Sequence, residues 1–136
     1  MTAIFVSHRS SDNAEAHALK NWLGEQGHEQ LFLDFDPADG IPAGVDWEQR
    51  LYQELRRCQA LLIVLTPAWL ESKWCGNELA IAREKGKAVF VVRVKPCPGD
   101  PIISAIQEVD LTLDRDAGLK KLAHGLGEHS AQNPSV

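Results

Sequence analysis

The sequence predicts an α/β fold whose central parallel sheet is covered by helices on both faces. Short apolar segments of strand length alternate along the chain with segments whose apolar residues recur at helical spacing. Residues 60–65 are continuously apolar rather than alternating, which is typical of a strand buried on both faces of a parallel sheet, and residues 88–94 are expected to be another buried strand. The length of 136 residues suits one domain with such a core. We therefore expect a flavodoxin-like three-layer sandwich with a central five-stranded parallel sheet.

Five segments are expected to be the strands of this sheet. In chain order they are residues 3–7, 30–34, 60–66, 88–94 and 109–113, and the last of them is weak. The carboxyl ends of parallel strands lie at one edge of a sheet, and open α/β folds bind their ligands along that edge. Residues that directly follow a strand are therefore the first candidates for a functional site.

Helices are expected between these strands. A first helix should begin after Ser10, Ser11 and Asp12, which are capping residue types, and should close at Gly24 and Gly27-His28. Residues 67–85 are expected to be helical, with a break near residues 72–76 and with Gly86 as a cap. Two further helices are predicted from apolar stripes: Trp47, Leu51, Leu55 and Cys58, then Leu119, Leu122, Ala123 and Leu126.

We expect residues 1–127 to form a single domain. Residues 128–136 lack apolar periodicity, so we expect them to form a flexible tail or a linker to a further domain.

Composition and charge argue against several classes of protein. The formal net charge of −5 argues against a nucleic-acid partner, because phosphate binding requires a basic face. No basic region precedes the first apolar segment, so no signal peptide is predicted. No apolar run reaches the roughly 20 residues that span a bilayer. We expect a soluble, cytoplasmic protein without membrane contact.

The spacing of cysteine and histidine residues indicates no metal site. Cys58, Cys75 and Cys97 are odd in number and widely spaced, which favours a reducing compartment over disulfides or structural zinc. Cys75 is interpreted as a small buried residue rather than a reactive thiol. The five histidines are scattered, so no metal is expected. The glycine-rich dinucleotide and P-loop motifs are also absent from the sequence.

The best candidate for chemistry follows the central strand. Trp74 and Glu78 are four residues apart in a segment expected to be helical, so they share one face of the helix. An aromatic surface beside a carboxylate could hold a ring and present an anion to an adjacent electron-poor centre. A packed tryptophan and a solvated glutamate are the alternative interpretation, since surface glutamates are common.

Four segments in a fixed order resemble the Toll/interleukin-1 receptor (TIR) domain family. Residues 4–9, Ile-Phe-Val-Ser-His-Arg, stand at the family's first-strand motif, and residues 31–34, Leu-Phe-Leu-Asp, stand at the end of its second strand. A loop with two glycines follows in residues 35–46, and residues 72–79 match the family's Ser-x-Trp-Cys-x-x-Glu-Leu motif. The ordered set is far more specific than any one motif, and it implies the TIR fold.

The resemblance implies two possible functions. Some TIR domains are scaffolds that signal by self-association, whereas others, including many bacterial and plant members, cleave NAD⁺ at the nicotinamide–ribose bond. The catalytic members resemble this chain in carrying a glutamate at the position of Glu78 and a tryptophan at that of Trp74. We therefore expect an NAD⁺ glycohydrolase that yields nicotinamide and ADP-ribose or a cyclic isomer, with Glu78 catalytic, NAD⁺ as substrate and no cofactor.

Two other functions stay open. One is a non-catalytic TIR–TIR interaction module, which would have no need of a carboxylate in a pocket. The other is a nucleoside-processing transferase of similar sheet topology that uses a glutamate nucleophile.

Substrate contacts are expected at the ends of the first two strands and beside Glu78. Arg9 can pair with a pyrophosphate or a carboxylate, or alternatively with Asp34 or Asp36 across the strand ends. Phe35 can lie near the substrate, as the resemblance implies, or pack in the core. The full set of predicted substrate-binding residues is Trp74, Ser7, Arg9, Ser10, Asp34 and Phe35.

The loop of residues 35–46 is expected, by resemblance, to mediate homotypic assembly with other TIR domains and to gate the pocket. Its glycines and prolines favour a few discrete conformations. Catalytic TIR domains tend to complete their sites between subunits, so activity is expected to depend on self-association. In a prokaryotic setting, such a protein would be a defence or signalling effector that depletes NAD⁺.

Overall fold

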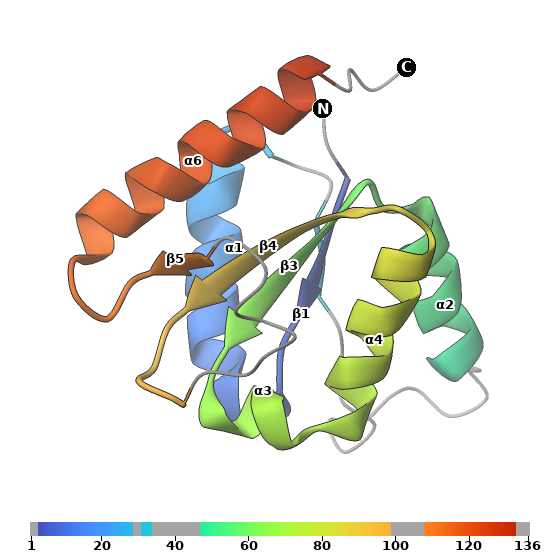
Figure 1. Ribbon diagram of the computed structural model, residues 1–136. Helices are drawn as coiled ribbons and strands as arrows, with labels where there is room; N and C mark the ends of the chain where they lie inside the picture. The colour runs from blue at the N-terminus through green and yellow to red at the C-terminus, as the bar shows by residue number, and fades with distance from the viewer. Residues whose placement is uncertain (1–2, 29–30, 34–46, 99–107, 133–136) are drawn as a thin grey trace.

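The computed structural model describes residues 3–28, 31–33, 47–98 and 108–132. Within these ranges the chain forms a five-stranded sheet in the order β2-β1-β3-β4-β5, and every strand pair is parallel (Figure 1). The predicted sheet is therefore confirmed. Its strands are β1 (Ile4–Ser7), β2 (Leu31–Leu33), β3 (Ala60–Leu65), β4 (Ala88–Arg93) and β5 (Glu108–Asp110).

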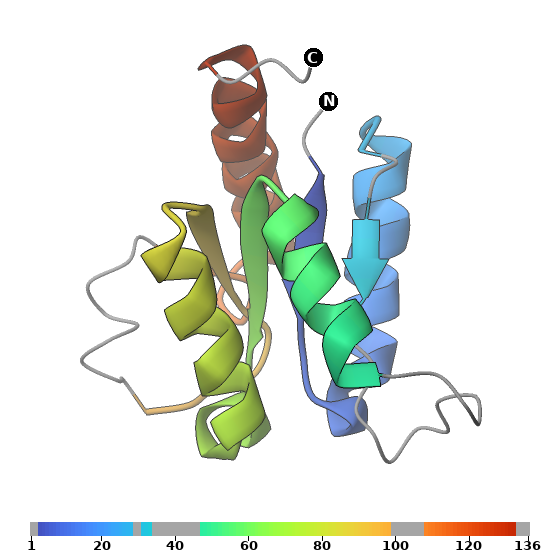
Figure 2. The same ribbon diagram turned by 90° about the vertical axis from the view of Figure 1, so that its right-hand side faces the viewer.

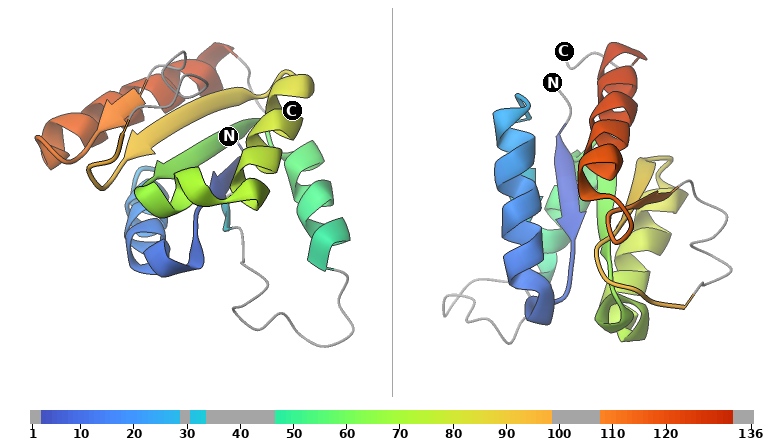
Figure 3. Two further views of the ribbon diagram at one scale, coloured as in Figure 1. Left: turned by 60° about the horizontal axis from the view of Figure 1, so that its bottom comes forward. Right: turned by 90° about the vertical axis from the view of Figure 1, so that its left-hand side faces the viewer.

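Helices cover both faces of the sheet, as the sequence predicts. Helices α1 (Asn13–Glu25) and α6 (Arg115–Gln132) pack on one face. Helices α2 (Trp47–Arg57), α3 (Pro67–Glu71) and α4 (Lys73–Glu84) pack on the other. Figure 2 shows α2 and α4 in front of the strands, and the right panel of Figure 3 shows α1 and α6 in front of them from the opposite side.

The central strand explains the continuous apolar sequence of residues 60–65. All six residues of β3 are buried. Leu62 and Val64 contribute to the core under α1 and α6, whereas Leu61 and Ile63 contribute to the core under α2, α3 and α4. Both faces of the strand are therefore apolar, as expected for a parallel sheet between two helical layers.

The helical segment after β3 is broken at a single residue. The hydroxyl of Thr66 caps α3 by accepting a hydrogen bond from the backbone N–H of Trp69 at 3.1 Å. Ser72 has an extended backbone (ψ 117°), which ends α3, and its hydroxyl caps α4 by accepting from the N–H of Cys75 at 3.1 Å. The predicted break is confirmed at the first residue of its range, while residues 73–76 are helical.

The ends of α1 and α4 can be compared with the ends that the sequence predicts. Helix α1 passes through Gly24 and ends at Glu25, so closure at Gly24 is wrong, whereas the predicted closure at Gly27 is confirmed by a turn with a φ of 95°. The predicted cap at Gly86 is confirmed, since this residue follows α4 with a φ of 69°, in the left-handed region that favours glycine.

The last strand and the last helix are displaced from the predicted ranges. The strand β5 ends at Asp110 rather than at residue 113, because Asp110 Oδ1 accepts from the backbone N–H of Thr112 at 2.8 Å and starts a turn. Helix α6 continues to Gln132, which places the first residues of the predicted flexible tail in a helix. A helix docked through its leucines can continue along polar sequence that needs no burial. None of the helices in the described ranges has the length and apolar character needed to cross a membrane.

Candidate functional site

Glu78 lies in the second turn of α4, with its side chain directed to the end of β1. Its exposed fraction is 1%. Ser7 is the last residue of β1 and is fully buried, and its Oγ donates a hydrogen bond to Glu78 Oε1 at 2.8 Å. Burial of a carboxylate is costly unless hydrogen bonds replace lost water. This bond therefore stabilises Glu78 in its buried position.

Trp69 is the second partner of the Ser7 hydroxyl. It lies on α3, is 4% exposed, and donates from its indole Nε1 to Ser7 Oγ at 2.9 Å. An indole N–H can only donate, and a hydroxyl has a single proton. Because Trp69 occupies an acceptor lone pair of Ser7, the Ser7 proton is directed to Glu78. We call Glu78, Ser7 and Trp69 the Glu78 triplet.

A second group of buried polar residues lies beside the triplet and is joined to it through Trp69. Asp12, at the end of the short 3₁₀ turn Ser10–Asp12, is 1% exposed. Its Oδ2 accepts from Thr66 Oγ1 at 2.6 Å, and its Oδ1 accepts from Lys95 Nζ at 2.6 Å. The same Thr66 hydroxyl accepts from the backbone N–H of Trp69. We call Asp12, Thr66 and Lys95 the Asp12 cluster.

The charges of the Asp12 cluster are matched. The hydrogen bond to Asp12, and then the negative charge of that carboxylate, raise the pKa of the Lys95 ammonium above its ordinary value. Lys95 also lies 4.0 Å from Glu15 on α1. Lys95 is partly exposed, whereas Asp12 and Thr66 are buried, so the cluster connects the protein surface to the interior.

Arg9 lies next to the triplet at the start of α4. Its Nη1 donates to Ser72 Oγ at 3.3 Å, and this Oγ is also the cap of α4. The guanidinium of Arg9 is thus placed at the first turn of the helix that carries Glu78. Asp34 and Asp36, its alternative predicted partners, lie outside the described residues.

The residue between Ser7 and Arg9 helps to fix this turn. His8 is buried, and its Nε2 lies 2.7 Å from Asn13 Oδ1. The carbonyl oxygen of His8 lies 4.0 Å from Cys75 Sγ. Cys75 is 1% exposed, which confirms its interpretation as a small buried residue.

The structure brings several of the predicted site residues together. Ser7, Arg9 and Glu78 converge at the carboxyl end of β1, and Ser10 follows in the adjoining 3₁₀ turn. Trp74 lies on α4, one turn before Glu78. The side chains of Ser10 and Trp74 are outside the described part of the structure, as are Asp34, Phe35 and the rest of the loop of residues 35–46. The substrate contacts expected of these residues stay predictions.

The hydroxyl of Ser7, a predicted substrate contact, is hydrogen-bonded within the protein. Both described hydrogen bonds of its hydroxyl are made to protein groups, one on α3 and one on α4. Its observed contacts are those of a support for Glu78, and direct contact with substrate stays a prediction.

Sequence reasoning does not find Trp69, Thr66, Asp12 or Lys95. Trp69 falls within the segment of residues 67–85 that is expected to be helical, Asp12 reads as a helix cap, and Thr66 reads as the end of a strand. One available signal is the polar Thr66 at the carboxyl end of a buried strand, followed three residues later by a tryptophan that has an N–H to satisfy.

The described cysteines and carboxylates do not assemble a metal centre. Within the described residues, no group of three or more histidine, cysteine, aspartate or glutamate side chains is placed to hold a metal ion. Cys58, Cys75 and Cys97 are thiols rather than members of disulfides. Burial raises the pKa of both Cys58 and Cys97, although Lys87 and Arg93 respectively oppose that shift.

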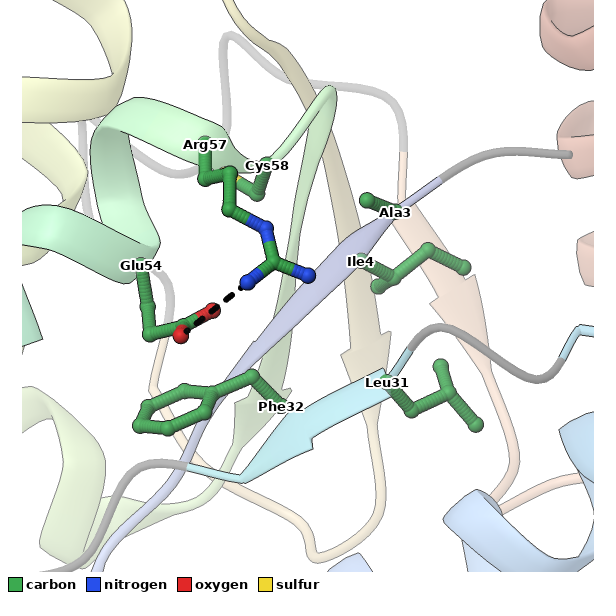
Figure 4. A pocket seen from close by; sticks show the side chains of 7 residues that line it. All are labelled: Ala3, Ile4, Leu31, Phe32, Glu54, Arg57 and Cys58. Carbon is green, nitrogen blue, oxygen red and sulfur yellow. Dashed lines mark ion pairs between the residues drawn. The ribbon is translucent and has the colours of Figure 1, made fainter. Parts of the chain in front are cut away.

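A separate hollow lies at the opposite end of the sheet. It has a volume of about 330 Å³ and is bordered by the first residues of β1 and β2 and by the last turn of α2 (Figure 4). Glu54 and Arg57 form an ion pair across 3.7 Å on its α2 side. Because Glu78 lies at the carboxyl end of β1, this hollow is not part of the Glu78 site.

Comparison with known proteins agrees with this fold. The model of a family described as the TIR domain matches residues 4–123, so the chain belongs to the TIR domain family. The crystal structure of the TIR domain of the Toll-related receptor TRR-2 from Hydra magnipapillata superposes with a TM-score of 0.73 at 12% identity, covering 95% of this chain and 98% of that one. At this identity, the similarity establishes the fold alone.

One curated relative is named for an enzymatic activity. The "Probable 2' cyclic ADP-D-ribose synthase BdTIR" of Brachypodium distachyon is 26% identical over 133 residues, which is 93% of this chain. The aligned region covers only 56% of the relative's length.

Proposed function

We propose that this TIR domain cleaves NAD⁺ at the bond between nicotinamide and ribose, with Glu78 as its catalytic residue. The observation that supports this most is a buried glutamate on α4, held by a directed hydrogen bond at the carboxyl edge of a parallel sheet. Perturbed or buried ionisable groups in such positions are candidates for function. The similarity to a relative named as a cyclic ADP-ribose synthase supports the substrate class.

The chemistry explains why one carboxylate is sufficient. Glycosidases generally use two carboxyl groups, one of which protonates a poor leaving group. The nicotinamide of NAD⁺ is a cationic pyridinium and leaves as a neutral base, so it needs no general acid. Water then adds to the ribose carbon and releases a proton, giving ADP-ribose. Attack by a hydroxyl of the ADP-ribose itself gives a cyclic isomer instead.

Glu78 would act on the ribose. Loss of nicotinamide leaves an oxocarbenium-like sugar, and a carboxylate stabilises this charge or accepts hydrogen bonds from the ribose hydroxyls. Such an interaction is stronger in a site that excludes water than at the surface. The hydrogen bond from Ser7 to Oε1 holds the carboxyl group in a fixed orientation. Trp74, one turn earlier on α4, would contribute to the wall that holds the reacting ring and ribose.

Access to Glu78 must change during the reaction. At 1% exposure, its carboxylate cannot touch a ribose until the groups around it move. We propose that homotypic assembly of TIR domains, involving the loop of residues 35–46, provides this change and thereby activates the enzyme. Such a protein would be a prokaryotic defence or signalling effector that depletes NAD⁺ when assembled.

The same burial favours one alternative function. In a domain that acts as a non-catalytic TIR–TIR scaffold, a glutamate that is 1% exposed would join β1 to α4 and have no further role. This alternative predicts that loss of Glu78 changes stability without changing any turnover.

Nicotinamide release from NAD⁺ tests the proposal. Concentrated wild-type protein should release nicotinamide, and chromatography of the second product would separate ADP-ribose from a cyclic isomer. Glu78→Ala, verified as folded by circular dichroism, should release none above the uncatalysed rate. Wild-type turnover by the folded Glu78→Ala protein would contradict the assignment, and turnover of free nucleosides rather than NAD⁺ would favour a transferase.

A further inference from the structure

Trp69 connects the Glu78 triplet to the Asp12 cluster. Its indole N–H donates to Ser7 in the Glu78 triplet at 2.9 Å, and its backbone N–H donates to Thr66 in the Asp12 cluster at 3.1 Å. Hydrogen bonds therefore hold both its backbone and its indole ring, and the residue is 4% exposed. Movement of α3 would displace the indole from Ser7.

The direction of each hydroxyl bond follows from its donors. Thr66 gives its single proton to Asp12 Oδ2, so its lone pair is the acceptor for Trp69. Ser7 accepts from Trp69, so its single proton is the donor to Glu78. Asp12 Oδ1 accepts from the Lys95 ammonium at 2.6 Å, and Asp12 Oδ2 is the acceptor of the Thr66 proton. Both N–H groups of Trp69 can only donate, so each makes a hydroxyl its acceptor and leaves the single proton of that hydroxyl for a carboxylate.

We propose that Trp69 is a positioning residue for the reaction at Glu78, and that the Asp12 cluster holds it in place. This inference rests on the proposed function. Trp69 acts through Ser7, because its indole keeps the Ser7 proton aimed at the carboxylate and so fixes the orientation of Glu78. A small displacement of a catalytic group lowers the reaction rate strongly, so residues that hold it in position affect kcat.

Trp69→Phe is the most direct variant, because it removes one N–H and keeps an aromatic ring on α3. We expect kcat to fall by about 10-fold to 100-fold while KM for NAD⁺ stays within about twofold, since a positioning residue does not touch the substrate. Trp22→Phe is the matched control: Trp22 lies on α1, packed against the core on the other face of the sheet, and this variant should retain wild-type kcat.

Thr66 offers a second test of the same series. Thr66→Val keeps the shape of the side chain but removes both hydrogen bonds, and Thr66→Ser keeps the hydroxyl. Both variants should be assayed below their melting temperatures, with the folded fraction measured. We expect Thr66→Val to lower kcat at unchanged KM and Thr66→Ser to restore it, which a purely structural role of Thr66 would not produce once the protein is folded.

A spectroscopic measurement tests the hydrogen bond itself. In ¹⁵N spectra of the full chain, the indole N–H of Trp69 should exchange slowly with solvent, and Ser7→Ala should remove that protection. An indole N–H that exchanges equally fast in both proteins would overturn the inference whatever the activity.

The kinetic outcomes separate the inference from the function on which it rests. An active wild type whose folded Trp69→Phe variant has wild-type kcat would overturn the inference alone. A raised KM with unchanged kcat would also overturn it, because Trp69 would then contact the substrate. A wild type that releases no nicotinamide even when assembled would overturn the proposed function, and the positioning role with it.

Discussion

At the scale of residues, the hydrogen bonds of the site are directed because each hydroxyl group has a single proton to donate. Ser7 and Thr66 each donate once and accept once, and the donor-only indole of Trp69 decides which way the Ser7 proton points. The sequence predicts Glu78 as catalytic through its spacing from Trp74 and its family motif. It does not predict Trp69, because apolar periodicity indicates that a residue is buried and says nothing about where its N–H is directed.

Lys95 gives a pH-dependent prediction. Hydrogen bonding to Asp12 raises the pKa of Lys95, so the protonated form stabilises the folded state below the ordinary lysine pKa. That contribution should be lost as the pH rises through the higher pKa of the folded state. Lys95→Gln should therefore be less stable than wild type at pH near 7, and the difference should shrink under strongly alkaline conditions.

Urea denaturation of both proteins across the alkaline range would measure this effect. A difference in the free energy of unfolding that is independent of pH would show that Lys95 does not stabilise Asp12 through its charge.

At the scale of elements, the sequence predicts which segments are strands and helices better than where they end. The break after β3 follows from Ser72, which both ends α3 and caps α4. The end of β5 depends on a side-chain bond from Asp110 to Thr112, and the end of α6 depends on docking of its leucines. The apolar periodicity of a sequence does not reveal these interactions, so it does not predict where the elements end.

The close approach of α6 to β5 gives a prediction about stability. A Cβ added at Gly118 would lie 2.5 Å from Leu111 Cδ2 and 3.1 Å from the carbonyl oxygen of Asp110. Gly118→Ala should lower the free energy of unfolding by about 1–3 kcal/mol, because the backbone oxygen cannot move aside easily. Gly127→Ala, in the same helix and with no heavy atom within 4 Å, should raise it by up to about 1 kcal/mol.

The urea midpoints of these two variants would show whether α6 packs on β5 as described. Equal midpoints would mean that Gly118 has room for a methyl group and that the helix lies farther from the strand.

At the scale of the whole molecule, the order of the strands produces the site. The sheet places β1 beside β3, so the residues after both strands, together with α3 and α4, meet at one edge. Alternation of strands and helices predicts this convergence from the sequence alone, and the TIR motifs predict the family. Contacts that join segments far apart in the chain, such as Asp12 with Lys95, could not be predicted because no local pattern encodes them.

The most direct test of the central claim compares two isosteric changes on α4. Glu78→Gln removes the charge of the buried carboxylate and keeps an acceptor for Ser7, whereas Glu84→Gln makes the same change at an exposed position of the same helix. Nicotinamide release from NAD⁺, measured per folded protein, should fall by at least about 100-fold in Glu78→Gln and stay near wild type in Glu84→Gln. A folded Glu78→Gln protein that turns NAD⁺ over at the wild-type rate would contradict the catalytic role of Glu78.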